Sequence, residues 1–242
     1  MGPLRSEAVR LAAVPLPTLP AVPGDGRLGD PRFRRLLGTD AWNRLPSAVR
    51  ARFAHRLADG RTVVYRGRVT AMRANRVGRW LAQALRLVGA PLPLARDTGV
   101  ASVISVTEDA AAYNGQGGGQ NWTRLYANRT GFPQIIHSAK RFTGPTGLEE
   151  HLGRACGVGL VMMLDVGEES GALVFRDRGY ALEFGLRRLR LPRWLEPGRL
   201  AVRHEDRGHG RFLFALTLDH PWAGELIHQE GLYEDVPEEA GR

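Results

Sequence analysis

The chain has little of several residue types that mark common protein classes. Among 242 residues, Cys156 is the only cysteine and Lys140 the only lysine. A single cysteine excludes an internal disulfide and any cysteine-based metal cluster, and it fits a reducing, cytoplasmic location. No run of 18 apolar residues occurs, so no transmembrane helix is predicted. The most apolar N-terminal stretch, residues 11–22, is interrupted by three prolines and does not resemble a signal peptide.

The positive charge is almost all arginine and is unevenly distributed. The formal net charge is +9, with +12 in residues 1–100 and −3 in residues 101–242. An anionic partner is therefore expected to meet the N-terminal half. Arginine together with abundant Ala, Gly and Pro is also typical of GC-rich coding. No basic strand carries the aromatic ladder that binds single-stranded nucleic acid, so no nucleic-acid partner is predicted.

The length and the hydrophobic content of 43% suffice for one domain with a sizeable core. Residues 1–28 contain five prolines and little periodicity, which predicts a disordered tail. Residues 29–236 are expected to form a single β-rich domain, followed by an acidic C-terminal tail over 237–242.

Two short helices are predicted before the first strand. Asp30 and Pro31 are typical of a helix start, and this helix is expected to run through Leu37 and end at Gly38. A second helix is predicted over residues 46–57, where Val49 and Phe53 recur at helical spacing. Residues 61–73 then alternate between apolar and polar side chains, as expected for a strand.

A basic amphipathic helix is predicted over residues 74–88. Its apolar positions include Val77 and Trp80, and the opposite face holds Arg76, Arg79 and Arg86. Two interpretations remain open. The helix docks its apolar face on a sheet with the arginines in water, or it lies on a membrane surface, peripheral to the inner face, with these arginines near anionic lipids.

The rest of the chain consists of short alternating runs separated by glycine-rich turns. Strands are predicted at 99–107, 121–127, 133–142, 147–153, 158–166, 172–177, 180–190, 199–205, 211–219 and 225–233. Turns at 167–171, 178–179 and 206–210 are expected to make neighbouring strands hairpins. Parallel pairing needs helical crossovers, which are missing here. The predicted fold is mainly β (α+β), a strongly curved antiparallel sheet or up-and-down β-barrel with two or three N-terminal helices.

One strand carries the best candidates for ligand binding. Trp122, Arg124 and Tyr126 project from the same face, and a guanidinium between aromatic rings suits a carboxylate or phosphate. The alternative is structural, with Trp122 in the core and Arg124 paired to an interior acid such as Glu150. A buried arginine needs an anionic partner in either case, and the sequence leaves open whether protein or ligand supplies it.

Catalytic, metal and cofactor sites are less well supported. Glu150 with His151 or His228 could serve as acid and base groups in an interior cavity. The spacing of His204 and His209 matches no zinc motif, so no metal is predicted. The glycine cluster at 115–120 precedes a strand rather than a helix, unlike a dinucleotide-binding loop, so no cofactor is predicted.

Several segments resemble the bacterial domain of unknown function 4166. The similarity covers residues 30–234 and is carried by 36–38, 45–50, 65–67, 92–93, 122–124 and 191–197. The family's tryptophan-x-arginine strand matches Trp122-Thr123-Arg124. Its glutamate-phenylalanine-glycine step is altered to Glu150-His151-Leu152-Gly153, and its closing strand pair resembles residues 220–224. The family often follows a saccharopine-dehydrogenase-like Rossmann module, and the resemblance therefore implies a reductase as partner but no activity of its own.

Three functions follow as hypotheses. The first is a binding module for an amphipathic acidic or lipid-like small molecule, accessory to an oxidoreductase, in which Arg124 and Trp122 hold the head group. The second is an isomerase or cyclase that uses Glu150 with His151 or His228. The third is a docking domain with a filled interior that binds a partner reductase through the basic N-terminal half.

Overall fold

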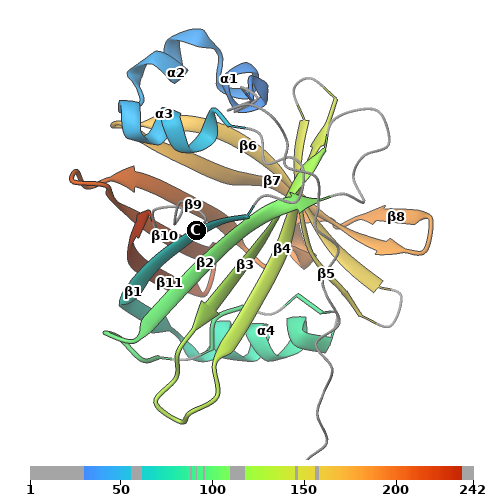
Figure 1. Ribbon diagram of the computed structural model, residues 1–242. Coiled ribbons are helices and arrows are strands. Elements are labelled where there is room, and N and C mark those ends of the chain that lie inside the picture. The colour runs from blue at the N-terminus through green and yellow to red at the C-terminus, as the bar shows by residue number, and fades with distance from the viewer. Residues whose placement is uncertain are drawn as a thin grey trace, which may run out of the picture.

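The computed structural model describes one barrel built from ten antiparallel strands (Figure 1). The described residues are 30–55, 62–87, 89–90, 92–94, 96–109, 118–144, 147–155 and 158–235. The helices are α1 (Arg32–Leu37), α2 (Thr39–Arg44), α3 (Ser47–Phe53) and α4 (Arg76–Leu87), with a short 3-10 helix η2 (Arg193–Leu195). The strands are β1 (Thr62–Ala74), β2 (Ala101–Asp109), β3 (Gly119–Tyr126), β4 (Gln134–Thr143), β5 (Gly147–Ala155), β6 (Val158–Glu169), β7 (Ala172–Phe184), β8 (Arg187–Arg190), β9 (Arg199–Asp206), β10 (Arg211–His220) and β11 (Gly224–Asp235). The tails expected at 1–28 and 237–242, and Cys156, lie outside these residues.

The barrel closes by pairing each strand with its neighbour in sequence. β1 to β7 pair in order, β7 pairs with β9, β9 with β10, β10 with β11, and β11 returns to β1. The strand β8 pairs only with the end of β7 and extends outside the closed barrel. The predicted mainly β, up-and-down barrel with short N-terminal helices is therefore confirmed. Closure pairs every edge of the ten strands, which explains why the chain needs no crossover helices.

Three details of the sequence-based assignment are wrong. Residues 180–190 were expected to form one strand, but a turn at 185–186 separates the end of β7 from β8. Residues 178–179 were expected to form a hairpin turn, but β7 runs through them without interruption. Gly179 has φ +134° and lies at a shift in register against Met163 and Leu164, so it forms a bulge. The sequence also did not predict α2, which follows Gly38 directly; the second predicted helix corresponds to α3, which ends at Phe53.

The helices α1, α2 and α3 cover one end of the barrel, called here the helical end (Figure 1). At this end Phe33 of α1 packs edge-on against Phe142 and Phe53, with ring centroids 5.1 Å apart in both pairs. The side chain of Asp30 accepts hydrogen bonds from the backbone and guanidinium of Arg32, which holds the start of α1. Aromatic packing therefore closes the interior at the helical end.

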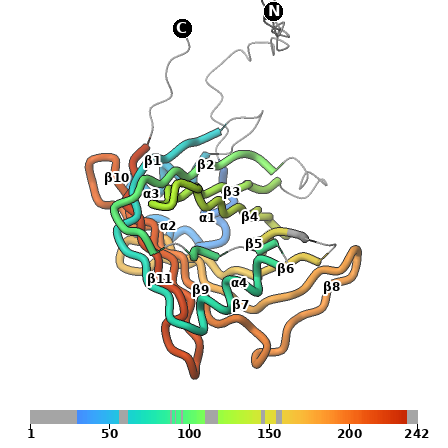
Figure 2. Tube along the Cα trace, turned by 90° about the horizontal axis from the view of Figure 1, so that it is seen from below, coloured from blue at the N-terminus to red at the C-terminus, as the bar shows by residue number. Residues whose placement is uncertain are grey.

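The helix α4 crosses the opposite end, called here the apolar end, at which β1 and β10 finish and β9 and β11 begin (Figure 2). It starts beside β11, where the backbone amide of Asn75 donates to Leu226. Beyond its last turn, the backbone of Gly89 contacts Gly153 of β5 so closely that only glycine fits there. Among the described residues, no helix is long and apolar enough to cross a membrane.

The face that α4 turns to the barrel differs from the expected one. Gly78 and Ala82 are buried against β11, whereas Val77 and Trp80 were expected to face the sheet and are instead 51% and 79% exposed. The reason is steric. A Cβ atom at Gly78 would overlap the backbone oxygen of Leu226, so the helix approaches β11 through its smallest residue. Val77 and Trp80 turn outward as a result, whereas Leu81 and Leu85 pack against the core.

We expect Gly78→Ala to destabilise the protein although the same change in an exposed helix usually stabilises by about 1 kcal/mol. The added methyl group must push α4 away from Leu226. Urea unfolding of Gly78→Ala and of Gln83→Ala, an exposed position on the same helix, provides the test. Unfolding free energies that rise equally for both variants would contradict the close contact.

Candidate functional site

Polar side chains from three neighbouring strands meet inside the barrel. Trp122, Arg124 and Tyr126 of β3 all point inward and are buried, as the alternation of their strand predicted. Ser138 and Lys140 are buried on β4, and Lys140 lies directly opposite Glu150 in the register of β4 and β5. The antiparallel pairing of these strands therefore brings Arg124, Lys140 and Glu150 to one inner surface.

One carboxylate oxygen is the centre of this buried cluster, which consists of Arg124, Ser138, Lys140 and Glu150. The Oε1 atom of Glu150 accepts from Ser138 Oγ at 2.6 Å and from Lys140 Nζ at 2.9 Å. Arg124 Nη2 lies 3.4 Å from the same oxygen and donates to Ser138 Oγ at 2.7 Å. Arg124 Nε is buried and has no hydrogen-bond partner among the described residues.

The cluster holds two cationic side chains and one carboxylate. Burial alone would raise the pKa of Glu150, but Lys140, Arg124 and the Ser138 hydroxyl lower it to about 2. Burial lowers the pKa of Lys140, and the nearby Arg124 adds to this effect while Glu150 opposes it. With every group ionised, the cluster carries one uncompensated positive charge inside the protein, which is unfavourable unless an anion binds or Lys140 releases its proton.

A small cavity lies beside the cluster and extends toward the apolar end. Its volume is about 40 Å³, and Arg124, Lys140 and Glu150 line its polar side. The remaining lining is mostly apolar and includes Leu85 of α4 and Leu92 beyond it. The space is enough for about three water molecules or one small polar group.

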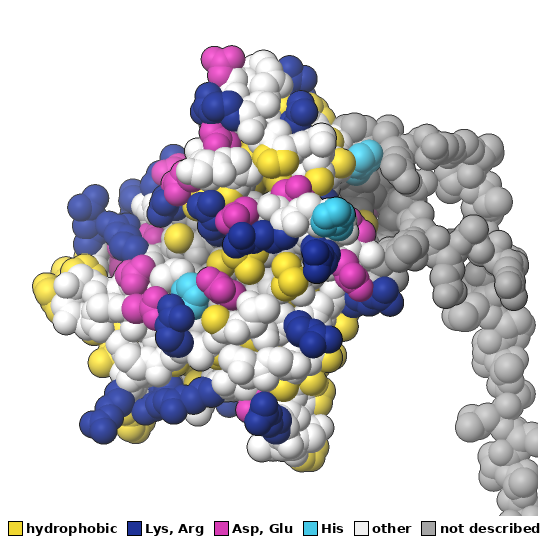
Figure 3. All heavy atoms as spheres, turned by 90° about the vertical axis from the view of Figure 1, so that its left-hand side faces the viewer, with side chains coloured by type: hydrophobic (Ala, Val, Ile, Leu, Met, Phe, Trp, Pro, Cys, Tyr) yellow, Lys and Arg dark blue, Asp and Glu magenta, His cyan; other side chains and the backbone are white. Residues whose placement is uncertain are grey.

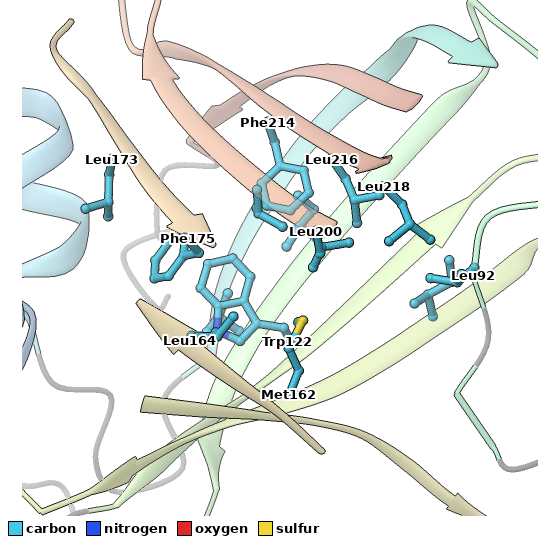
Figure 4. Packing of buried hydrophobic residues seen from close by; sticks show 14 of the residues in the cluster. Leu92, Trp122, Met162, Leu164, Leu173, Phe175, Leu200, Phe214, Leu216 and Leu218 are labelled. Atoms are coloured by element: carbon cyan, nitrogen blue, oxygen red, sulfur yellow. The ribbon is translucent and has the colours of Figure 1, made fainter. Parts of the chain in front are cut away.

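Aromatic and aliphatic side chains surround the cationic groups (Figure 4). Lys140 Nζ lies 5.1 Å from the ring centre of Trp122 and 5.4 Å from that of Phe175. The guanidinium of Arg124 lies 5.8 Å from the ring centre of Phe214. Figure 4 shows Trp122 among Phe175, Leu164 and Met162, with the leucines of β10 further toward Leu92. The aromatic faces stabilise positive charge in surroundings that exclude water.

A family model for the domain of unknown function DUF4166 matches residues 45–232, most of the chain. The chain belongs to this family. Neither a curated protein nor a solved structure matches it. The family assignment confirms the resemblance read from the tryptophan-x-arginine strand and brings no activity with it. Within this DUF4166 domain, the function must be argued from the cluster itself.

The structure does not bring together the residues considered for acid–base catalysis. His151 follows Glu150 and points to the other face of β5, where it lies 3.4 Å from Glu149 and 3.7 Å from Glu183. His228 contacts Glu230 and Thr217 away from the cavity. Only Glu150 reaches the interior, and a carboxylate with a pKa of about 2 is a weak base at neutral pH.

Lys140 is the interior residue that the sequence analysis missed as a candidate. A signal was present, because it is the only lysine in a chain that otherwise uses arginine, and it shares the inward alternation of Ile136 and Ser138. Trp122 and Tyr126 were predicted to bind ligand and are buried inside the barrel, but neither lines the cavity. Of the described residues, no three His, Cys, Asp or Glu side chains gather as a metal site.

His204 is also buried, but it lies near the helical end rather than with His228. Its ring stacks on Phe212 with centroids 4.3 Å apart and meets Phe53 edge-on. Burial, and to a smaller extent Arg52, lowers the pKa of His204 to about 3. The imidazole is therefore neutral at physiological pH and serves as a packing residue.

Removing a cation from the cluster should change the free energy of unfolding less than removing its carboxylate does. Lys140→Met leaves Arg124 balanced by Glu150, and we expect the unfolding free energy to stay within about 1 kcal/mol of wild type. Glu150→Gln leaves two buried cations without a carboxylate and should cost about 3–5 kcal/mol. Chemical denaturation of both variants at neutral pH tests this. Equal losses would mean that the cluster carries no excess positive charge.

Stability should fall as pH decreases from 6.5 toward 3 because His204 gains a proton in the unfolded chain before the folded protein can accept one. Replacing His204 by leucine should flatten this part of the profile of unfolding free energy against pH. A profile unchanged by His204→Leu would show that the imidazole does not resist protonation.

Proposed function

We propose that the barrel interior binds the anionic group of a small amphipathic molecule, most simply a carboxylate. The observation that carries this proposal is the buried cluster itself, in which Glu150 is the only carboxylate of the described residues that pairs with Arg124 and Lys140. An anion beside Arg124 would balance the remaining charge and provide an acceptor for the free Nε atom.

The surroundings of the cluster support a ligand with an apolar part. Leu85, Leu92 and Leu218 lie on the side of the cavity toward the apolar end, while Arg124 and Glu150 lie deeper in the barrel. A ligand that enters past α4 would thus place its head group at the cations and its hydrocarbon against leucines. The volume of about 40 Å³ suits a short chain; a lipid-sized ligand requires these leucines to move.

The other two functions are less well supported. An isomerase or cyclase that uses Glu150 with His151 or His228 lacks a shared cavity for the three groups. A role beside a partner reductase follows from the family resemblance alone and stays a prediction. The interior cluster supports the binding hypothesis over docking, because a purely docking domain has no need of two buried cations beside an open space.

Calorimetric titration with propionate, butyrate and hexanoate tests the proposal, with the corresponding primary amides as uncharged controls. We expect the carboxylates to bind and the amides to bind at least about tenfold more weakly, since a charge-assisted hydrogen bond is lost. Binding should also take up protons, measured in buffers of different ionisation enthalpy, because the bound anion raises the pKa of Lys140.

Variants identify the binding groups. Lys140→Met and Arg124→Met each keep one cation opposite Glu150, so both should fold and both should lose at least about tenfold in carboxylate affinity. Arg176→Met, on an exposed arginine paired with Glu169, is the matched control and should bind as wild type. No binding of any carboxylate to the wild type, or equal binding to all variants, would rule out the proposed site.

A further inference from the structure

All of the exposed large hydrophobic side chains in the described ranges belong to connections at the apolar end. They are Val77, Trp80 and Leu87 on α4, Phe132 and Ile135 at the β3–β4 turn, Phe184, Leu186 and Leu189 in the β7–β8 hairpin, Trp194 and Leu195 in η2, and Trp222 in the β10–β11 turn. Scattered exposed hydrophobics are ordinary on protein surfaces, but their restriction to one end is not.

The backbone pairing of the strands also places these connections at one end of the barrel. Ala74 at the end of β1 pairs with Ile227 near the start of β11, and Arg199 at the start of β9 pairs with Asp219 near the end of β10. The end of β3 lies beside the start of β2. The β7–β8 hairpin and η2 both belong to the connection from β7 to β9. In an up-and-down barrel alternate connections share an end, so these four connections lie around one rim, which Figure 2 shows from below with α4 across it.

Three of the five tryptophans in the chain project from this rim. Trp80, Trp194 and Trp222 are 79%, 71% and 85% exposed, whereas Trp42 and Trp122 are buried. The backbone next to Trp222 is fixed, because the side chain of Asn75 donates to the carbonyl of Ala223 at 2.9 Å. Tryptophan is the side chain most suited to a boundary between water and hydrocarbon, since its ring is apolar and its N–H is polar.

Arginines without carboxylate partners accompany the tryptophans. No described carboxylate forms an ion pair with the exposed Arg76 and Arg86 of α4 or with Arg190 and Arg193. A surface hollow of about 400 Å³ beside η2 is lined by four arginines and Glu196. Two of these arginines have carboxylate partners, since Arg178 pairs with Asp165 and Arg199 pairs with Asp177 and Glu196, whereas Arg190 and Arg193 have none among the described residues. Near Trp222, the exposed Glu225 is neutralised by Arg73. The apolar end therefore attracts anions.

We propose that the apolar end docks on an anionic lipid bilayer, with the tryptophans at the level of the head groups and the arginines beside lipid phosphates. The hydrophobic side chains come from four separate connections around a rim rather than from one continuous patch. That arrangement suits a soft planar surface better than a protein partner, whose interface has its strongest contacts clustered at the centre. Figure 3 shows basic side chains gathered at the lower end of the molecule, where α4 lies in Figure 1.

The proposal extends the membrane interpretation of the α4 arginines and also explains why Trp80 faces outward. Arg76, Trp80 and Arg86 would lie along the bilayer surface while Gly78 and Ala82 remain against β11. Docking in this orientation directs the open side of the cavity to the lipid. The inference rests on exposed side chains and holds whether or not the interior binds a carboxylate.

Flotation of the full chain with phosphatidylcholine vesicles, with and without phosphatidylglycerol, tests the proposal. We expect binding only to the anionic vesicles, weakening as salt is added, together with quenching of tryptophan fluorescence by brominated lipids. Trp80→Ser with Trp222→Ser should remove most of the quenching and weaken binding. Arg76→Gln with Arg86→Gln should weaken binding about thirtyfold, because each basic side chain near the surface contributes about fivefold.

The matched control is Arg34→Gln with Arg211→Gln, the same charge change at exposed positions of the helical end, which should bind vesicles as wild type does. If this control weakens vesicle binding equally, the binding is due to general electrostatic attraction, and the proposal of a specific docking face is wrong. Absence of vesicle binding would also overturn it. A dimer in native mass spectrometry that Trp80→Ser with Trp222→Ser converts to monomer would assign the rim to contact between copies of the chain instead.

Discussion

The buried carboxylate of Glu150 is the interaction on which the interior depends. It lies in the middle of a barrel whose other inward side chains are mostly apolar, and it makes the burial of Arg124 and Lys140 tolerable. One carboxylate balances only one of the two cations. The polar cluster therefore holds the interior together through hydrogen bonds to one oxygen of Glu150, but its charges do not balance. The same group of residues can thus serve as a structural ion pair and as a ligand site.

The two ends of the barrel differ in a way that follows from the up-and-down connection of its strands. At the helical end, α1 to α3 bury aromatic rings against β4, β7 and β9, so the interior is closed by packing. At the apolar end, a single helix crosses the opening through a glycine contact, and tryptophans and leucines point outward. Because of this difference between the ends, the proposed ligand would enter at the apolar end, and the proposed bilayer would contact the same end. The two proposals are independent of each other.

Much of the fold could be predicted because alternation is a local property. The strand at Thr62–Ala74 and the inward face shared by Trp122, Arg124 and Tyr126 follow from side chains two residues apart. The prediction failed where a distant backbone decides. A turn is predicted at Gly179 because glycine often occurs in turns. This prediction is wrong, since pairing with β6 and β9 keeps β7 extended and the glycine forms a bulge. The prediction that Trp80 faces the barrel is wrong for a similar reason. Periodicity identifies the apolar face of α4, but it does not show that the backbone of Leu226 leaves room only for the face with Gly78.

Composition and spacing by themselves determined the class of the molecule: one antiparallel, mainly β domain of the DUF4166 family, with Arg124 pointing inward. The sequence named Glu150 as a possible partner of Arg124, but only the tertiary structure decided which groups meet that arginine, because the contacts with Lys140 and Glu150 depend on the register of three neighbouring strands. It also decided that His151 and His228 lie outside the cavity and that the exposed tryptophans share one rim. Alternation within a strand determines the direction in which a side chain points, whereas the register between strands determines which other side chains it contacts.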